Sequence, residues 1–110
     1  MLVATSPSLG QYLTDSTGMT LYVFSEDTPD ASACTDLCPN TWMPFQPPAG
    51  SLSVPAGVSG TLAVMTLPDG SQQVTYNHRP LYTFLGDADP GDAEGQNIAS
   101  FGGTWTVATP

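Results

Sequence analysis

One short pattern occurs twice in this chain, sixty residues apart. Residues 21–27 read Leu-Tyr-Val-Phe-Ser-Glu-Asp and residues 81–87 read Leu-Tyr-Thr-Phe-Leu-Gly-Asp, so Leu, Tyr, Phe and Asp are identical at an offset of 60. A tryptophan follows each copy, Trp42 and Trp105, at an offset of 63. A repeat period close to half the chain length predicts one structural unit in each half.

Chain length and composition limit what these two units can form. The 110 residues are enough for one domain with a single core, and the 11 glycines and 11 prolines suit short strands joined by many turns. We therefore predict a single all-β domain over residues 1–110, built from two pseudo-repeated antiparallel β units. The repeats are expected at about 8–48 and about 60–110.

Turn signals between alternating segments predict where the strands lie. Two hairpins are expected, one with strands 11–14 and 20–24 and one with strands 61–67 and 72–76. A further turn over 77–80 leads into a strand at 81–84. Residues 44–60 are rich in Pro, Ser and Gly and read as the connection between the repeats. A helix is expected only as a short turn near 32–37 or 93–100.

The motif residues have an expected place in each strand. Side chains alternate between the two faces of a strand, so the Tyr and Phe of each motif share one face. We expect an aromatic core packed across a pseudo-two-fold axis, formed by Tyr22, Phe24, Trp42, Tyr82, Phe84 and Trp105. The alternative is an aromatic platform for a sugar or a peptide. Asp27 and Asp87 each end a strand, where a carboxylate can accept backbone N–H bonds.

These residues resemble a bacterial family of secreted-repeat lipoproteins with a conserved Tyr-x-(Phe/Trp/Tyr)-x-x-Asp motif. The resemblance covers nearly the whole chain, including Trp42-Met43-Pro44, Pro90-Gly91-Asp92 and Gly95-Gln96. It implies a secreted, cell-surface or periplasmic location in bacteria and tandem repeats, and it implies no catalytic residues. This sequence departs from the pattern because it has no lipid-attachment cysteine at its start, and its start also lacks a signal peptide's features.

The charge balance limits the partners. Ten acidic residues face one cation, Arg79, and the net charge of −9 disfavours nucleic acid and anionic membranes as partners. No segment has the length and apolar character of a membrane span. Cys34 and Cys38 are an even pair in a small domain of extracellular type, which indicates a disulfide, with a reactive dithiol as the alternative.

Metal binding is possible at two places. Four carboxylates fall within eight residues, a density of hard oxygen ligands that suits calcium, with a solvated acidic turn as the alternative: Asp87, Asp89, Asp92 and Glu94. Copper could bind His78 together with Met19, Met43 or Met65. Arg79 could instead pair with a nearby carboxylate and organise the second acidic loop.

The sequence contains no catalytic constellation. It has one histidine, no Gly-x-Ser-x-Gly elbow and no glycine-rich loop opening a helix, so we expect no enzyme. The predicted role is a non-catalytic interaction or structural module of the cell envelope. Its partner would be an envelope protein, a polysaccharide or the chain itself. The alternative function is an exported metal-binding module.

Overall fold

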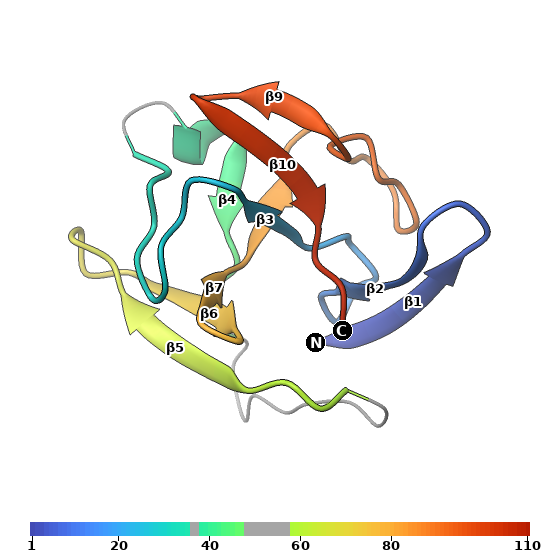
Figure 1. The fold of residues 1–110 in the computed structure, drawn as a ribbon, viewed down its shortest axis with the longest axis horizontal. Coiled ribbons are helices and arrows are strands. Elements are labelled where there is room, and N and C mark those ends of the chain that lie inside the picture. Colours follow the sequence, from blue (N-terminus) through green and yellow to red (C-terminus); the bar gives the residue numbers. More distant parts are fainter. Residues whose placement is uncertain (36–37, 48–57) are drawn as a thin grey trace.

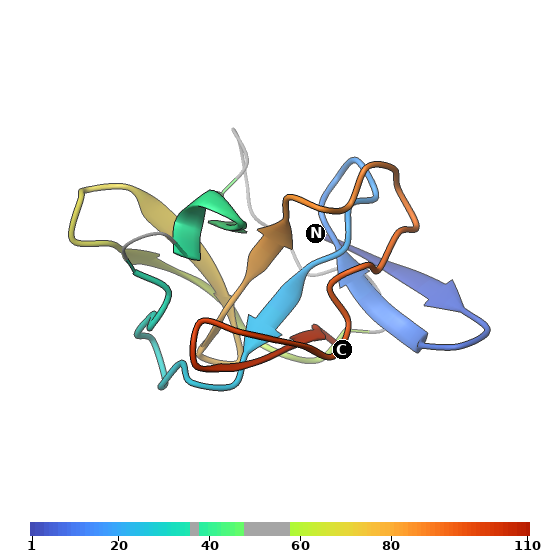
Figure 2. The same ribbon diagram turned by 90° about the horizontal axis from the view of Figure 1, so that it is seen from above.

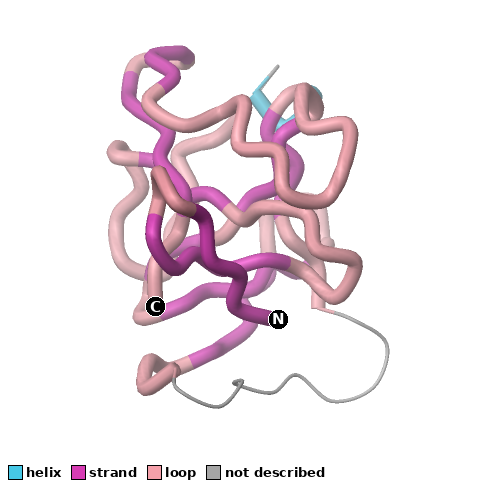
Figure 3. The backbone as a smooth tube through the Cα atoms, turned by 90° about the vertical axis from the view of Figure 1, so that its right-hand side faces the viewer, coloured by secondary structure: helices cyan, strands magenta, loops and turns pink. Residues whose placement is uncertain are grey.

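A computed structural model describes residues 1–35, 38–47 and 58–110 of the chain, and these residues form an all-β fold, as the sequence predicts (Figure 1). Its elements in chain order are β1 (Leu2–Ser6), β2 (Gly10–Thr14), β3 (Tyr22–Phe24), the 3-10 turn η1 (Cys38–Asn40), β4 (Trp42–Pro44), β5 (Leu62–Thr66), β6 (Gln72–Tyr76), β7 (Arg79–Pro80), β8 (Tyr82–Phe84), β9 (Ile98–Ser100) and β10 (Gly103–Val107). Short strands joined by longer loops dominate the described chain (Figure 3).

The two motif strands meet at the centre of a five-stranded sheet with the order β4-β8-β3-β10-β9. β3 and β8 are antiparallel, with Tyr22 paired to Tyr82, so a pseudo-two-fold axis passes between them. The outer neighbours are exchanged between the copies, because β4 of the first copy pairs with β8 and β10 of the second copy pairs with β3. Each repeat therefore completes the sheet of the other.

Two smaller sheets lie on opposite sides of the central strands (Figure 2). β5, β6 and β7 form one of them, with Leu62 paired to Tyr76 and Thr66 to Gln72, which confirms the hairpin expected over residues 61–76. β1 and β2 form the other, with Val3 paired to Leu13. β1 was not predicted, since its short run carries little alternation and its structure depends on pairing with β2.

Three local expectations need correction. The hairpin expected between residues 11–14 and 20–24 exists only as a tight turn with one isolated bridge, Thr14 to Thr20, and its two strands enter different sheets. The helical turn lies at Cys38–Asn40 and not within the described residues 32–35, whereas 98–100 is a strand because β10 pairs with it. Residues 36–37, and residues 48–57 of the expected connection, lie outside the described part.

The strand alternation separates two buried clusters, one on each face of the motif strands. The first contains the motif tyrosines, both tryptophans and both cysteines. The second contains the aliphatic residues between them, including Leu21, Val23 and Leu81. Both faces of β3 are therefore buried. None of the described residues forms a helix long and apolar enough to span a membrane.

Candidate functional site

The tyrosine of each motif binds the aspartate of the other motif. The Tyr22 hydroxyl donates to Asp87 Oδ2 at 2.7 Å, and the Tyr82 hydroxyl donates to Asp27 Oδ2, also at 2.7 Å. This exchange between the copies was not predicted from the sequence. The spacing within one copy does not indicate it, because the strand ends at Phe24 and a turn follows, in which Asp27 donates its N–H to Phe24 O.

The second carboxylate oxygen of each aspartate holds the loop that follows it. Asp27 Oδ1 accepts the Ala33 N–H at 2.6 Å, and Asp87 Oδ1 accepts the Glu94 N–H at 2.8 Å. This is the backbone capping expected from the sequence. One aspartate thus joins three parts: the end of its own motif strand, its own loop and the tyrosine of the other copy.

Burial sets the protonation of these four groups. Burial is the main reason that the pKa of Asp87 and the pKa of Asp27 both rise above the usual aspartate range. The pKa of Tyr22 and that of Tyr82 are also raised, first by burial and further by the neighbouring carboxylate. The phenols therefore stay protonated and act as the donors of two structural hydrogen bonds.

Four aromatic rings stack in a column beside these bonds. The ring centroids are 4.2 Å apart for Phe24 and Trp105, 4.0 Å for Trp105 and Trp42, and 4.2 Å for Trp42 and Phe84. Both tryptophans have no exposed surface, so neither presents a free face to a sugar or a peptide. Gly95 lies against the column, and a Cβ there would come within 2.6 Å of the Trp42 ring.

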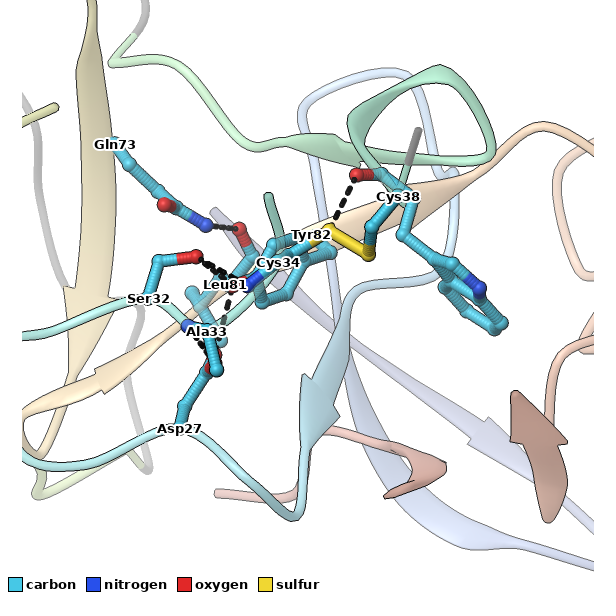
Figure 4. The surroundings of a disulfide bond; sticks show 9 residues. Asp27, Ser32, Ala33, Cys34, Cys38, Gln73, Leu81 and Tyr82 are labelled. Carbon is cyan, nitrogen blue, oxygen red and sulfur yellow. Dashed lines mark hydrogen bonds between the residues drawn. A yellow bond between two sulfur atoms is a disulfide. The ribbon is translucent and has the colours of Figure 1, made fainter. Parts of the chain in front are cut away.

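The predicted disulfide between Cys34 and Cys38 is confirmed, and the described residues contain no free cysteine. It lies beside the motif of the second copy (Figure 4). Ser32 connects the two regions, because its hydroxyl accepts the Cys34 N–H at 3.1 Å and is hydrogen-bonded to the Tyr82 hydroxyl. The disulfide-closed loop is therefore hydrogen-bonded, through Ser32, to the tyrosine of the second motif.

The four acidic residues proposed as calcium ligands lie in one loop but do not all point inward. Asp87 uses both oxygens on protein donors, as described above. Asp92 Oδ2 accepts the N–H groups of Ala88 and Asp89 at 3.2 and 3.1 Å. Asp89 and Glu94 are exposed. Among the described residues no three His, Cys, Asp or Glu side chains form a group that could hold a metal ion, and calcium binding stays a prediction.

His78 lies in the turn before the second motif and contacts the first copy. Its Nδ1 is 2.9 Å from Asp30 Oδ2, and its carbonyl oxygen accepts the Asp30 N–H at 2.8 Å. This is the one contact of a His, Lys or Arg side chain with a carboxylate within residues 1–35, 38–47 and 58–110, so Arg79 pairs with no carboxylate among them, contrary to the expectation. The turn that contains Arg79 lines one hollow of the surface together with residues 27–29 of the first copy. Copper binding by His78 with Met19, Met43 or Met65 stays a prediction.

One protein family matches this sequence, and it is described as a secreted repeat of unknown function. The match has two segments, residues 3–46 and 63–109, which together cover most of the chain. The two segments contain one motif each, so they coincide with the two copies found from the residues. No curated protein and no solved structure is matched by the sequence.

Proposed function

The chain belongs to the family described as a secreted repeat of unknown function, and we propose that it is a non-catalytic module acting in the bacterial cell envelope, outside the cytoplasm. Its task is to bind an envelope component or to serve as a structural part. The observation that carries this proposal is the reciprocal bonding of Tyr22 to Asp87 and of Tyr82 to Asp27. The tyrosine and aspartate that recur in both copies thereby hold the two repeats together.

Two further observations support this role. A disulfide persists in oxidising compartments, which suits an extracytoplasmic protein. The motif tyrosines stay protonated and both tryptophans are fully buried, which supports a structural use of these residues. The surface that remains for a partner consists of the loops after the motifs and the outer strands, and the net charge of −9 favours a neutral or basic partner over nucleic acid.

The test is binding of the purified chain to bacterial cell-wall material and to solubilised envelope proteins. We expect the chain to be retained by at least one of these, and we expect Tyr82→Phe to be retained equally well at a temperature where it stays folded. A motif that itself bound the ligand would lose retention in that variant. Absence of retention by every envelope fraction, together with absence of self-association, would overturn the proposal.

A second pair of variants locates the binding surface. Asp89→Asn with Glu94→Gln removes two exposed charges of the second loop, neither of which has a side-chain hydrogen bond among the described residues. Glu26→Gln is the matched control, since it removes an exposed charge elsewhere. Loss of retention in the first variant but not in the control would place the partner at the second loop.

A further inference from the structure

β5 is an outer strand whose second edge pairs with no strand of the part of the chain that the structure describes. Within the described residues it pairs only with β6, and it lies at the periphery of the fold (Figure 1). Its sequence, Leu-Ala-Val-Met-Thr, has no charge and no proline, and Val64 in its middle is 42% exposed. Soluble proteins usually protect such an edge with charges, prolines or bulges, because its free N–H and C=O groups can pair with another strand.

Hydrogen bonds on the far side of β6 show which groups face this edge. Val64 is paired with Val74, but Val74 donates its N–H to Phe45 O at 2.8 Å and accepts the Leu81 N–H at 3.0 Å. The N–H and C=O groups of Val74 therefore point away from β5. Because Val64 is paired with Val74, its own N–H and C=O groups point away from β6, toward the outer edge of β5. Antiparallel strands alternate in this respect, so Leu62 and Thr66 also direct their N–H and C=O groups to the edge.

We propose that this edge pairs with the same edge of a second copy of the chain, antiparallel and centred on Val64. Val64 then lies opposite Val64 of the second copy, and Leu62 lies opposite Thr66. In this register every outward-facing residue of β5 has a partner with which it exchanges two hydrogen bonds. The contact is closed by a two-fold axis, so it produces a dimer and not a filament. It deepens the proposed function by naming self-association as one interaction of the module.

Charge decides between the possible orientations. The turn after β5 carries the exposed Asp69, whereas the segment before it, residues 58–61, is uncharged. Antiparallel pairing places the Asp69 turn of each copy beside the uncharged segment of the other. Parallel pairing would bring the two Asp69 carboxylates together. Residues 58–67 contain no acidic residue, and salt at physiological ionic strength screens the repulsion between exposed charges that are more than about 8 Å apart.

β1 is the equivalent outer strand of the first copy and provides the comparison. Leu13 donates to Ala108 O and accepts the Leu21 N–H, so Val3, its partner in β1, also faces outward. Val3 nevertheless packs against the aliphatic cluster and is half-buried, whereas its counterpart Val64 is exposed. In addition, the next outward position after Thr5 is Pro7, which has no N–H to donate. The dimer contact therefore belongs to β5.

The experiment measures the mass of the purified full chain in solution by sedimentation over a range of concentrations. We expect a concentration-dependent dimer for the native chain. Val64→Lys and Val64→Glu should each dissociate it, with affinity reduced about tenfold or more, because like charges lie directly opposite each other. An equimolar mixture of these two variants should dimerise again. Thr5→Lys, on the equivalent exposed edge of β1, should remain a dimer.

Circular dichroism and melting of each variant verify that it is folded. A native chain that stays monomeric at its highest soluble concentration overturns the proposal, and so does a mixture that fails to recover while the native chain dimerises. Retention of Val64→Lys by envelope fractions is measured in parallel. Retained monomers would support the envelope role without the dimer, so the two proposals can fail separately.

Discussion

The two copies agree closely at the centre of the molecule and differ in the loops after their motifs. At the centre the same triangle of three backbone hydrogen bonds occurs twice. In one triangle Leu13 N donates to Ala108 O, Ala108 N to Leu21 O and Leu21 N to Leu13 O. In the other, Val74 N donates to Phe45 O, Phe45 N to Leu81 O and Leu81 N to Val74 O. After the motif the first copy has a loop closed by a disulfide, and the second has an acidic turn without cysteine. The shared part holds the fold, which leaves the loops free to differ.

The largest expected effect is the loss of stability on removing a tryptophan, and it tests whether the two copies contribute equally to the core. Trp42→Ala and Trp105→Ala each remove half of a stacked pair with no exposed surface. We expect each to lower the free energy of unfolding by about 3–5 kcal/mol, a large share of the stability of a small domain. Urea unfolding followed by circular dichroism measures this. If one substitution were tolerated and the other not, the two copies would not share the core equally.

The reciprocal bonds should differ in strength because their burial differs. Asp87 is buried whereas Asp27 is partly exposed. Tyr22→Phe should therefore cost about 2 kcal/mol of unfolding free energy and Tyr82→Phe about 1 kcal/mol. Double-mutant cycles with Asp87→Asn and Asp27→Asn should show coupling of Tyr22 with Asp87 but none with Asp27. Coupling within one copy instead of across copies would contradict the exchange.

The disulfide has no counterpart in the second copy. Its removal therefore tests how much the loop after the first motif contributes to stability. Replacing Cys34 and Cys38 together with alanine should lower the free energy of unfolding by about 2 kcal/mol, because the ring they close is small. The central sheet should survive. Thermal melting monitored by circular dichroism checks both points, and loss of the whole fold on reduction would show that the loop is needed for the centre.

The sequence predicted the features that depend on neighbours along the chain. The hairpin around Pro68-Asp69-Gly70 and the Cys34–Cys38 bridge follow from turn residues and short spacing. Alternation in residues 21–24 also indicated which side chains share a face, as the two buried clusters show. These contacts join residues close in sequence, and local propensity decides them.

Contacts between the copies could not be predicted in the same way. Both copies have the same hydrophobic pattern, so a tryptophan strand fits either motif strand, and the alternation says nothing about which copy it joins. Trp105 pairs with Phe24 and Trp42 pairs with Phe84, although the hydrophobic pattern would equally allow each tryptophan to pair within its own copy. The short strand 98–100 likewise has no signal of its own, since β10 supplies its partner.

Alkaline pH should lower the free energy of unfolding because the two motif tyrosines titrate differently in the folded and unfolded chain. Their pKa values are raised by burial and by a carboxylate, so above about pH 10 they lose a proton in the unfolded chain before the folded one. The folded state binds more protons in this range, and the free energy of unfolding therefore falls as the pH rises. The chain has no lysine to titrate in the same range. Urea unfolding at several alkaline pH values should show a steep decline.

The matched variant is the double substitution Tyr22→Phe with Tyr82→Phe. It removes both shifted groups and should flatten the decline, although it is less stable at neutral pH. Tyr12→Phe is the control, because Tyr12 is buried in the same cluster but is not hydrogen-bonded to a motif aspartate. An equally steep decline in the double variant would show that other groups cause the alkaline loss.

Calcium should have the smallest effect of all. The second loop gathers four carboxylates, but Asp87 already accepts Tyr22 and Glu94, and Asp92 already accepts two backbone N–H groups. Binding calcium with these groups would require exchanging bonds that hold the loop, so we expect only a small rise in melting temperature at millimolar calcium. Asp89→Asn with Glu94→Gln should abolish that rise, and Glu26→Gln should not. A large rise lost in the first variant would mean that the acidic loop rearranges around the ion, and the difference between the two loops would then be functional.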